Sequence, residues 1–114
     1  MKKLSVLLLL ITPFVLQFCS SSKKAAKAKE PKITYTANVQ PIMVAYCTPC
    51  HFPPKGNKKA FDNYLAVKTN IDSMIIRIQK NPGEKGFMPF KHPKLSDSTI
   101  NVFVKWKNDG LLEN

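Results

Sequence analysis

Two cysteines and a histidine stand together near the middle of this 114-residue chain, in the run Cys47-Thr48-Pro49-Cys50-His51. Positions three apart lie on the same side of a helical turn, so both thiols can react with a single partner. Three kinds of chemistry use such a run: a dithiol that cycles with a disulfide, half of a zinc site, and covalent attachment of haem. In the third, each thiol adds across one vinyl group of haem, and the adjacent imidazole binds the iron.

The rest of the sequence separates these three chemistries. A zinc site needs further soft ligands, and the only other cysteine and histidine are Cys19 and His92. A thioredoxin-like dithiol belongs beside a β-α-β pattern, which the chain lacks. A disulfide between Cys47 and Cys50 would leave His51 without a role. Because Cys-x-x-Cys-His is the c-type attachment signature, we predict one covalent haem c on both cysteines, with His51 as the proximal iron ligand.

A candidate for the distal iron ligand lies in the run Gly86-Phe87-Met88-Pro89. Glycine and proline flank Met88, so we expect a loop to present its thioether to the iron. His92 is the alternative ligand, and it is otherwise an exposed loop residue. Arg77 could hold a haem propionate through its forked guanidinium, or it could simply lie at the surface.

The first 19 residues are typical of an export signal. Two lysines precede an apolar stretch over residues 4–18, which is shorter than the roughly 20 residues of a transmembrane helix. Cys19 follows where this stretch ends, an arrangement that resembles a bacterial lipoprotein signal, in which the cysteine is lipidated and begins the mature chain. Ordinary cleavage after Ser22 is the alternative. The predicted location is the periplasmic face of a bacterial membrane, with the lipid anchor on Cys19.

Composition then divides the remainder into a tether and one domain. Residues 20–32 are rich in Ser, Lys and Ala, so we predict a flexible tether. Residues 33–114 form a unit small enough to need a metal, a disulfide or a cofactor for stability. This unit carries 11 basic and 6 acidic residues, and its cations are spread along the chain. We therefore predict no nucleic-acid partner, and redox partner proteins that include acidic ones.

Apolar residues at helical spacing predict an all-α domain. The expected helices cover residues 38–46, 61–67, 70–78 and 96–110, with irregular loops over 52–60 and 79–95. The last helix has the clearest boundaries, since Ser96 can cap its start and Gly110 can end it.

On these residues the domain resembles small single-haem cytochromes c of the class I type, over about residues 34–112. The stretch 38–42 leading to Tyr46-Cys47 is similar to their lead-in helix, and Gly86-Phe87-Met88-Pro89 is similar to their Met-Pro ligand loop. Leu95-Ser96, followed by Trp106 and Gly110, is similar to their closing helix. The resemblance implies a compact helical fold around one covalently attached haem, in which the first and last helices cross. The segment between His51 and Met88 is shorter than in many members, which implies a trimmed loop and helix.

The expected function is one-electron transfer, not catalysis. Histidine and methionine ligands together leave the iron no open position, and the thioether raises the potential relative to two imidazoles. The chain offers no paired carboxylates, no plausible Ser-His-Asp set and no second haem motif. Two alternatives remain open: a haem enzyme or sensor of gas or peroxide with an open sixth site, and an electron-entry subunit of a larger oxidoreductase.

Overall fold

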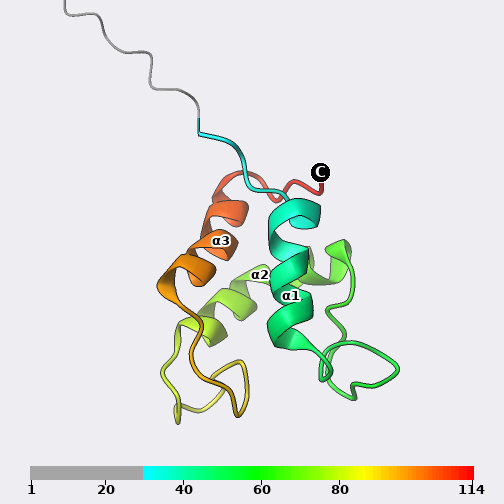
Figure 1. The fold of residues 1–114 in the computed structure, drawn as a ribbon, viewed down its shortest axis with the longest axis vertical. Helices are drawn as coiled ribbons and strands as arrows, with labels where there is room; N and C mark the ends of the chain where they lie inside the picture. The colour runs from blue at the N-terminus through cyan, green and yellow to red at the C-terminus, as the bar shows by residue number, and fades with distance from the viewer. Residues whose placement is uncertain (1–29) are drawn as a thin grey trace, which may run out of the picture.

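Three α-helices carry the fold in the computed structural model, which describes residues 30–114 (Figure 1). A short π-helix, η1 (Tyr35–Val39), runs directly into α1 (Gln40–Cys47), and α2 (Tyr64–Gln79) and α3 (Asp97–Asn108) follow. In this part of the chain the only β-pairing is an isolated bridge between Thr34 and Leu112. The all-α prediction is therefore confirmed for the described residues. The predicted signal peptide, its Cys19 and residues 20–29 of the tether lie outside them.

Polar side chains mark the starts of α2 and α3. The side-chain oxygen of Asn63 accepts a hydrogen bond from the Ala66 N–H at 2.9 Å, and Ser96 Oγ accepts one from the Thr99 N–H at 3.2 Å. Each bond satisfies a backbone donor that the first helical turn leaves without a partner. At the other end of α3, Gly110 adopts a φ of 100°, which a residue with a side chain adopts only under strain. The expected cap and stop of this helix are confirmed.

The two helices expected over residues 61–67 and 70–78 are one continuous helix, α2. Asn70, expected to cap the second of them, lies inside this helix, where its side-chain N–H donates to the Ala66 carbonyl at 2.7 Å. Asparagine satisfies its own polar group in this way and does not interrupt the helix. The prediction of a break was wrong because the same side chain can cap a helix or bond within it.

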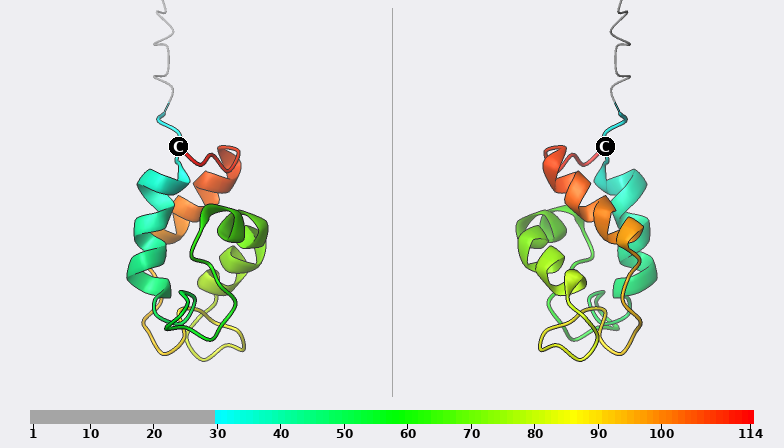
Figure 2. Two further views of the ribbon diagram at one scale, coloured as in Figure 1. Left: turned by 90° about the vertical axis from the view of Figure 1, so that its right-hand side faces the viewer. Right: turned by 90° about the vertical axis from the view of Figure 1, so that its left-hand side faces the viewer.

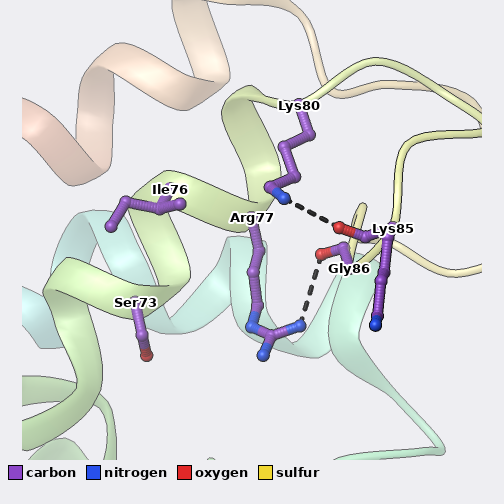
Figure 3. Close-up of a pocket in the computed structure, with 6 residues that line it drawn as sticks. All are labelled: Ser73, Ile76, Arg77, Lys80, Lys85 and Gly86. Carbon is purple, nitrogen blue, oxygen red and sulfur yellow. Dashed lines mark hydrogen bonds between the residues drawn. The ribbon is translucent and has the colours of Figure 1, made fainter.

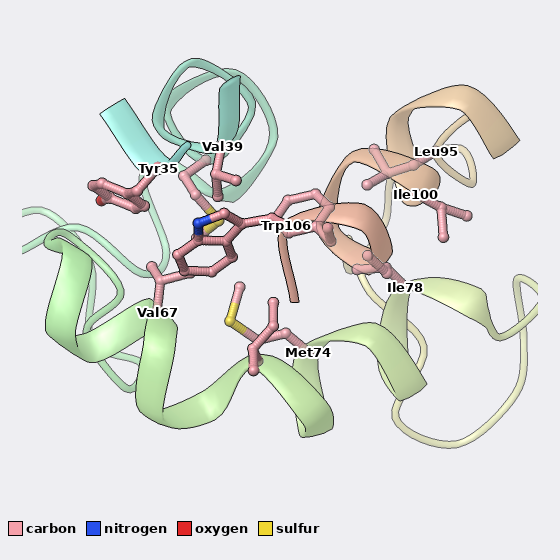
Figure 4. Close-up of a cluster of buried hydrophobic side chains, with 11 residues drawn as sticks. Tyr35, Val39, Val67, Met74, Ile78, Leu95, Ile100 and Trp106 are labelled. Carbon is pink, nitrogen blue, oxygen red and sulfur yellow. The ribbon is translucent and has the colours of Figure 1, made fainter. Parts of the chain in front are cut away.

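The three helices enclose one hydrophobic core, with Trp106 at its centre (Figure 4). Trp106, Phe103 and Met43 are almost completely buried, and they come from α3 and α1. The Trp106 Nε1–H donates to the Leu112 carbonyl at 2.8 Å, so the buried indole leaves no polar group without a partner. The Tyr35 ring lies 5.9 Å from the indole, centroid to centroid. The C-terminal segment is thereby fixed against the core.

The two ends of the domain are formed by different parts of the chain, the termini at one end and two loops at the other (Figures 1 and 2). At one end the described N-terminal segment meets the C-terminus: the Ile33 N–H donates to Asp109 Oδ2 at 2.7 Å, and the Tyr35 N–H donates to the Leu112 carbonyl at 2.8 Å. At the other end lie the loop that leaves α1 and the loop between α2 and α3. Within residues 30–114, no helix combines the length and apolar character needed to cross a membrane.

Candidate functional site

The Cys-x-x-Cys-His run forms a turn at the C-terminal end of α1. The His51 N–H donates to the Cys47 carbonyl at 3.0 Å, and the Phe52 N–H donates to the Pro49 carbonyl at 3.1 Å. Both cysteines of the run are free thiols. The structure thus brings the two predicted attachment residues and the predicted proximal ligand together in little more than one helical turn.

The two thiols of this turn have different surroundings. Cys47 is half-buried, with its Sγ 3.7 Å from the Met43 Sδ, whereas Cys50 is exposed. Burial raises the pKa of the Cys47 thiol to about 11, since the thiolate would lose its hydration. At neutral pH Cys47 is therefore a protonated thiol at the edge of the core. A single group that binds both sulfurs must touch this edge and also reach the surface at Cys50.

The imidazole of His51 is fixed in one tautomer. Its Nδ1 lies 2.6 Å from the backbone carbonyl oxygen of Lys59. A carbonyl can only accept a hydrogen bond, so Nδ1 carries the proton and Nε2 of the neutral ring keeps its lone pair. The Phe61 ring stacks on the imidazole, with centroids 4.7 Å apart and an interplanar angle of 21°. This arrangement leaves Nε2 as the nitrogen that can bind a metal, because metal-bound histidines commonly donate their other ring N–H to a carbonyl or carboxylate oxygen.

The loop after His51 closes back on the motif through its backbone. The Lys58 N–H donates to the Cys50 carbonyl at 3.2 Å, and the Phe61 N–H donates to the His51 carbonyl at 2.9 Å. Gly56 lies so close to this turn that an added Cβ would be only 2.2 Å from the Cys50 carbonyl oxygen. The loop therefore packs backbone against backbone, and only glycine fits at position 56 without a shift.

Met88, the predicted distal ligand, lies in the loop between α2 and α3. Its side chain is half-buried and packs against the hydrophobic core, as do those of Cys47 and Phe61. Its N–H donates to the Arg77 carbonyl at 3.2 Å, which joins this part of the loop to the end of α2. The neighbouring Phe87 is buried. The thioether thus borders the same core as the Cys-x-x-Cys-His turn.

The other two candidates occupy the surface near Met88. His92 is exposed, and its N–H donates to the Pro89 carbonyl at 3.2 Å. Arg77 is exposed as well, and its Nη1 donates to the Gly86 carbonyl at 3.4 Å. Arg77 therefore contacts the loop that carries Met88, a role that the sequence did not suggest.

Sequence reasoning missed the residues that orient His51. The Lys59 acceptor is a backbone carbonyl, which every residue type offers, so no sequence signal could identify it. The expected helix over residues 61–67 includes Phe61. The cap at Asn63 instead starts α2 at Tyr64, which leaves Phe61 in the loop, where its ring is available to stack.

Comparison of the chain with known protein families, with curated proteins and with solved structures finds no match. What the site could bind is therefore inferred from its own side chains. Within residues 30–114, no group of three or more His, Cys, Asp and Glu side chains is placed to hold a metal ion. A haem brings the equatorial ligands of its iron with it, so the protein need supply only two thiols and axial donors. By residue type, Cys47, Cys50, His51 and Met88 match that requirement.

Proposed function

We propose that the protein is a c-type cytochrome that carries one electron at a time on the extracytoplasmic side of a bacterial membrane. Cys47 and Cys50 hold one haem c covalently, His51 is the proximal iron ligand, and Met88 is the distal one. When bound, the haem supplies an iron that gains and loses one electron. The main support is the hydrogen bond from His51 Nδ1 to the Lys59 carbonyl, which leaves Nε2 as a metal donor beside two free thiols.

The protein's own residues tune this site in three ways. The hydrogen bond from His51 Nδ1 raises the basicity of Nε2, so this nitrogen binds a metal more strongly. It also fixes the plane of the ring, which the Phe61 ring restrains further. The Met88 thioether favours the reduced state relative to a second imidazole. Phe87 next to it is buried, and we expect its ring to limit the access of water to this ligand. If His51 and Met88 both bind the iron, no position on it would remain for a substrate, and electron transfer would be its only reaction.

The proposal includes the cytochrome c-like arrangement of the helices. In it, α1 and α3 form the crossing pair, and α2 lies between the two loops that carry the axial ligands. It is supported by the packing of Phe103 and Trp106 of α3 in one core with Met43 of α1. Outside the described residues, the proposal places a lipid anchor on Cys19, joined to the domain by the flexible tether.

Acid–acetone extraction tests the covalent link. The protein is produced in a host with haem-attachment machinery, denatured and extracted. Haem should stay on the wild-type chain, and the double variant Cys47→Ser, Cys50→Ser should release it. His92→Ala is a matched control that should keep its haem. Free extraction of haem from the wild type would rule out the proposed function.

Mass spectrometry of the membrane fraction tests the anchor separately. A chain that begins at Cys19 with added acyl mass is the expected result. A mature chain that begins at Lys23 without acyl mass would leave a soluble electron carrier and remove the anchor.

The charge of the domain, with 11 basic residues against 6 acidic ones, favours acidic proteins as redox partners.

A further inference from the structure

We infer that the C-terminal end of α2 clamps the loop that carries Met88, and that Arg77 and Lys80 are positioning residues for this ligand. The inference rests on the proposed function, because it takes Met88 as the distal iron ligand. It assigns to Arg77 a role other than binding a haem propionate.

Three hydrogen bonds form the clamp, and two of them are drawn in Figure 3. The Arg77 Nη1 donates to the Gly86 carbonyl at 3.4 Å, and the Lys80 Nζ donates to the Lys85 carbonyl at 2.7 Å. The third runs the other way, from the Met88 N–H to the Arg77 carbonyl at 3.2 Å. One end of a helix thus holds Lys85, Gly86 and Met88, which are three of the four consecutive loop residues 85–88.

Gly86 is part of the same contact. Its φ is 85°, and a Cβ built there would lie 3.0 Å from Arg77 Nη1. The guanidinium therefore lies against a stretch of backbone without a side chain, and the loop turns at this point in a conformation that glycine adopts without strain. A side chain at position 86 would require the tip of the Arg77 side chain to move.

The shallow pocket at this place has a volume of about 590 Å³, and Ser73 and Ile76 line it together with the residues of the clamp. Cations around a pocket could also indicate an anion site. Here the side chains of Arg77 and Lys80 already donate to loop carbonyls, so an anion would have to displace those bonds. A structural clamp accounts for both contacts directly.

A clamp at the surface has a measurable consequence. Side-chain hydrogen bonds in solvent are individually modest, so the loop should open transiently and release the thioether from iron. Removing one bond should raise the open fraction roughly fivefold, the factor that corresponds to one typical net hydrogen bond. The rate at which carbon monoxide binds to the ferrous protein reports this open fraction, because the ligand must wait for the sixth position to become free.

The first experiment measures three variants, Arg77→Met, Lys80→Met and the two combined, against Lys85→Met as the control. Lys85→Met removes one positive charge from the same pocket, while the Lys85 carbonyl that accepts from Lys80 remains. The long-wavelength band of sulfur-ligated ferric iron, the covalent haem content and the rate of carbon monoxide binding are measured for each. We expect the rate to rise roughly fivefold in each single variant and further in the double variant. The control and the haem content should not change.

A second experiment tests the clamp with two glycine variants that change no charge. Gly83 and Gly86 both have positive φ, but a Cβ at Gly83 meets nothing within 4 Å. Both alanine variants carry similar backbone strain, and only in Gly86→Ala must the tip of the Arg77 side chain also move. The sulfur–iron band should weaken more in Gly86→Ala than in Gly83→Ala.

The outcomes separate the clamp from the proposed function. Equal rates in the double variant and Lys85→Met, with the sulfur–iron band intact in the wild type, would overturn the clamp alone. A wild type with covalent haem but no such band would overturn both the clamp and the assignment of Met88. Equal band loss in the two glycine variants would show that the contact between Gly86 and Arg77 does not hold the ligand.

Discussion

The loop that follows His51 and the loop that carries Met88 are held in place by different means. The first closes on the motif by backbone hydrogen bonds, from Lys58 to Cys50 and from Phe61 to His51. The second also has backbone bonds, from Phe87 to Glu84 and from Met88 to Arg77, and the side chains of Arg77 and Lys80 at the end of α2 hold it in addition. One loop is held mainly by its own backbone, and the other also depends on side chains of a neighbouring helix.

This difference indicates which of the two proposed iron ligands, His51 or Met88, should dissociate more readily. Substituting a side chain cannot remove a backbone hydrogen bond, so the His51 loop should tolerate most side-chain changes and fail only where the backbone itself is crowded. The Met88 loop should respond to surface substitutions that leave the core untouched. An electron carrier built in this way would keep its haem and proximal ligand fixed, and its distal ligand would be the adjustable one.

The largest effect is expected from Gly56→Ala. A Cβ at this position would lie 2.2 Å from the carbonyl oxygens of Pro49 and Cys50, so the turn that carries His51 must shift. We expect a loss of about 3 kcal/mol in the free energy of unfolding, the upper part of the usual range for overpacking. Denaturant unfolding monitored by circular dichroism measures it. Gly83→Ala, where only backbone strain arises, should cost about 1 kcal/mol. Equal costs would show that the first loop is not closed tightly on the motif.

Met88→Ala should remove the distal ligand and leave the proximal side intact. The stability cost is expected to be about 2 kcal/mol, at the low end for a buried methionine because Met88 is only half-buried. The sulfur–iron band should disappear, the potential should fall, and the ferrous form should bind carbon monoxide readily.

Two results would change the assignment of the distal position. If His92→Ala opens the sixth site and Met88→Ala does not, His92 is the distal ligand. If the wild type is already five-coordinate, the electron-carrier proposal gives way to the haem enzyme or sensor. Both results come from the same optical spectra.

The sequence predicted the elements best where local signals agree. In α3 the cap at Ser96, the spacing of Ile100, Phe103 and Trp106 and the stop at Gly110 all indicate the same helix, and the structure has it. In α2 the local signals conflict, since Asn70 can cap a helix or bond within one. The core contacts of Ile71 and Met74 favour one long helix, and such long-range packing is not visible in a local pattern.

For the site, the sequence identified the reactive side chains and missed their supports. Cys47, Cys50 and His51 are recognisable by type and spacing, and the structure places them in one turn. The Lys59 carbonyl acts through the backbone, and its position depends on how the whole loop folds back. The contact between Arg77 and Gly86 joins a helix end to a loop nine residues later, so a pattern of residue types could not reveal it.

A smaller effect is expected from a side-chain tie between the middle of the His51 loop and α2. The Lys59 Nζ donates to the Asn70 side-chain oxygen at 2.5 Å. Because the backbone already holds this loop, Lys59→Met and Asn70→Ala should each cost less than about 1 kcal/mol in unfolding free energy. Both should leave the sulfur–iron band and the haem content unchanged, as should the control Lys58→Met. A loss of the band in either variant would mean that both loops depend on α2, and the contrast between them would disappear.

The smallest effect concerns the terminal end, which lies away from both loops and so provides a reference for them. Asp109 accepts from the Ile33 N–H at 2.7 Å and pairs with the Lys105 Nζ at 3.1 Å. The hydrogen bond from Ile33, followed by Lys105, holds the pKa of Asp109 below its ordinary value of 3.8. A carboxyl whose pKa is lowered on folding stabilises the protein fully above its unfolded pKa, and this contribution is lost as the pH falls through the folded value.

We therefore expect the melting temperature to fall between about pH 5 and pH 2, with a part of that slope missing in Asp109→Asn. The group lies near solvent, so the change is small and added salt should weaken it further. Over the upper part of this range the sulfur–iron band should stay constant in both proteins, because Asp109 touches neither loop. A band that weakens in step with the titration of Asp109, and that stays constant in Asp109→Asn, would show that the terminal end is coupled to the distal ligand. The Met88 loop would then be held through the whole helical core and not by the end of α2 alone.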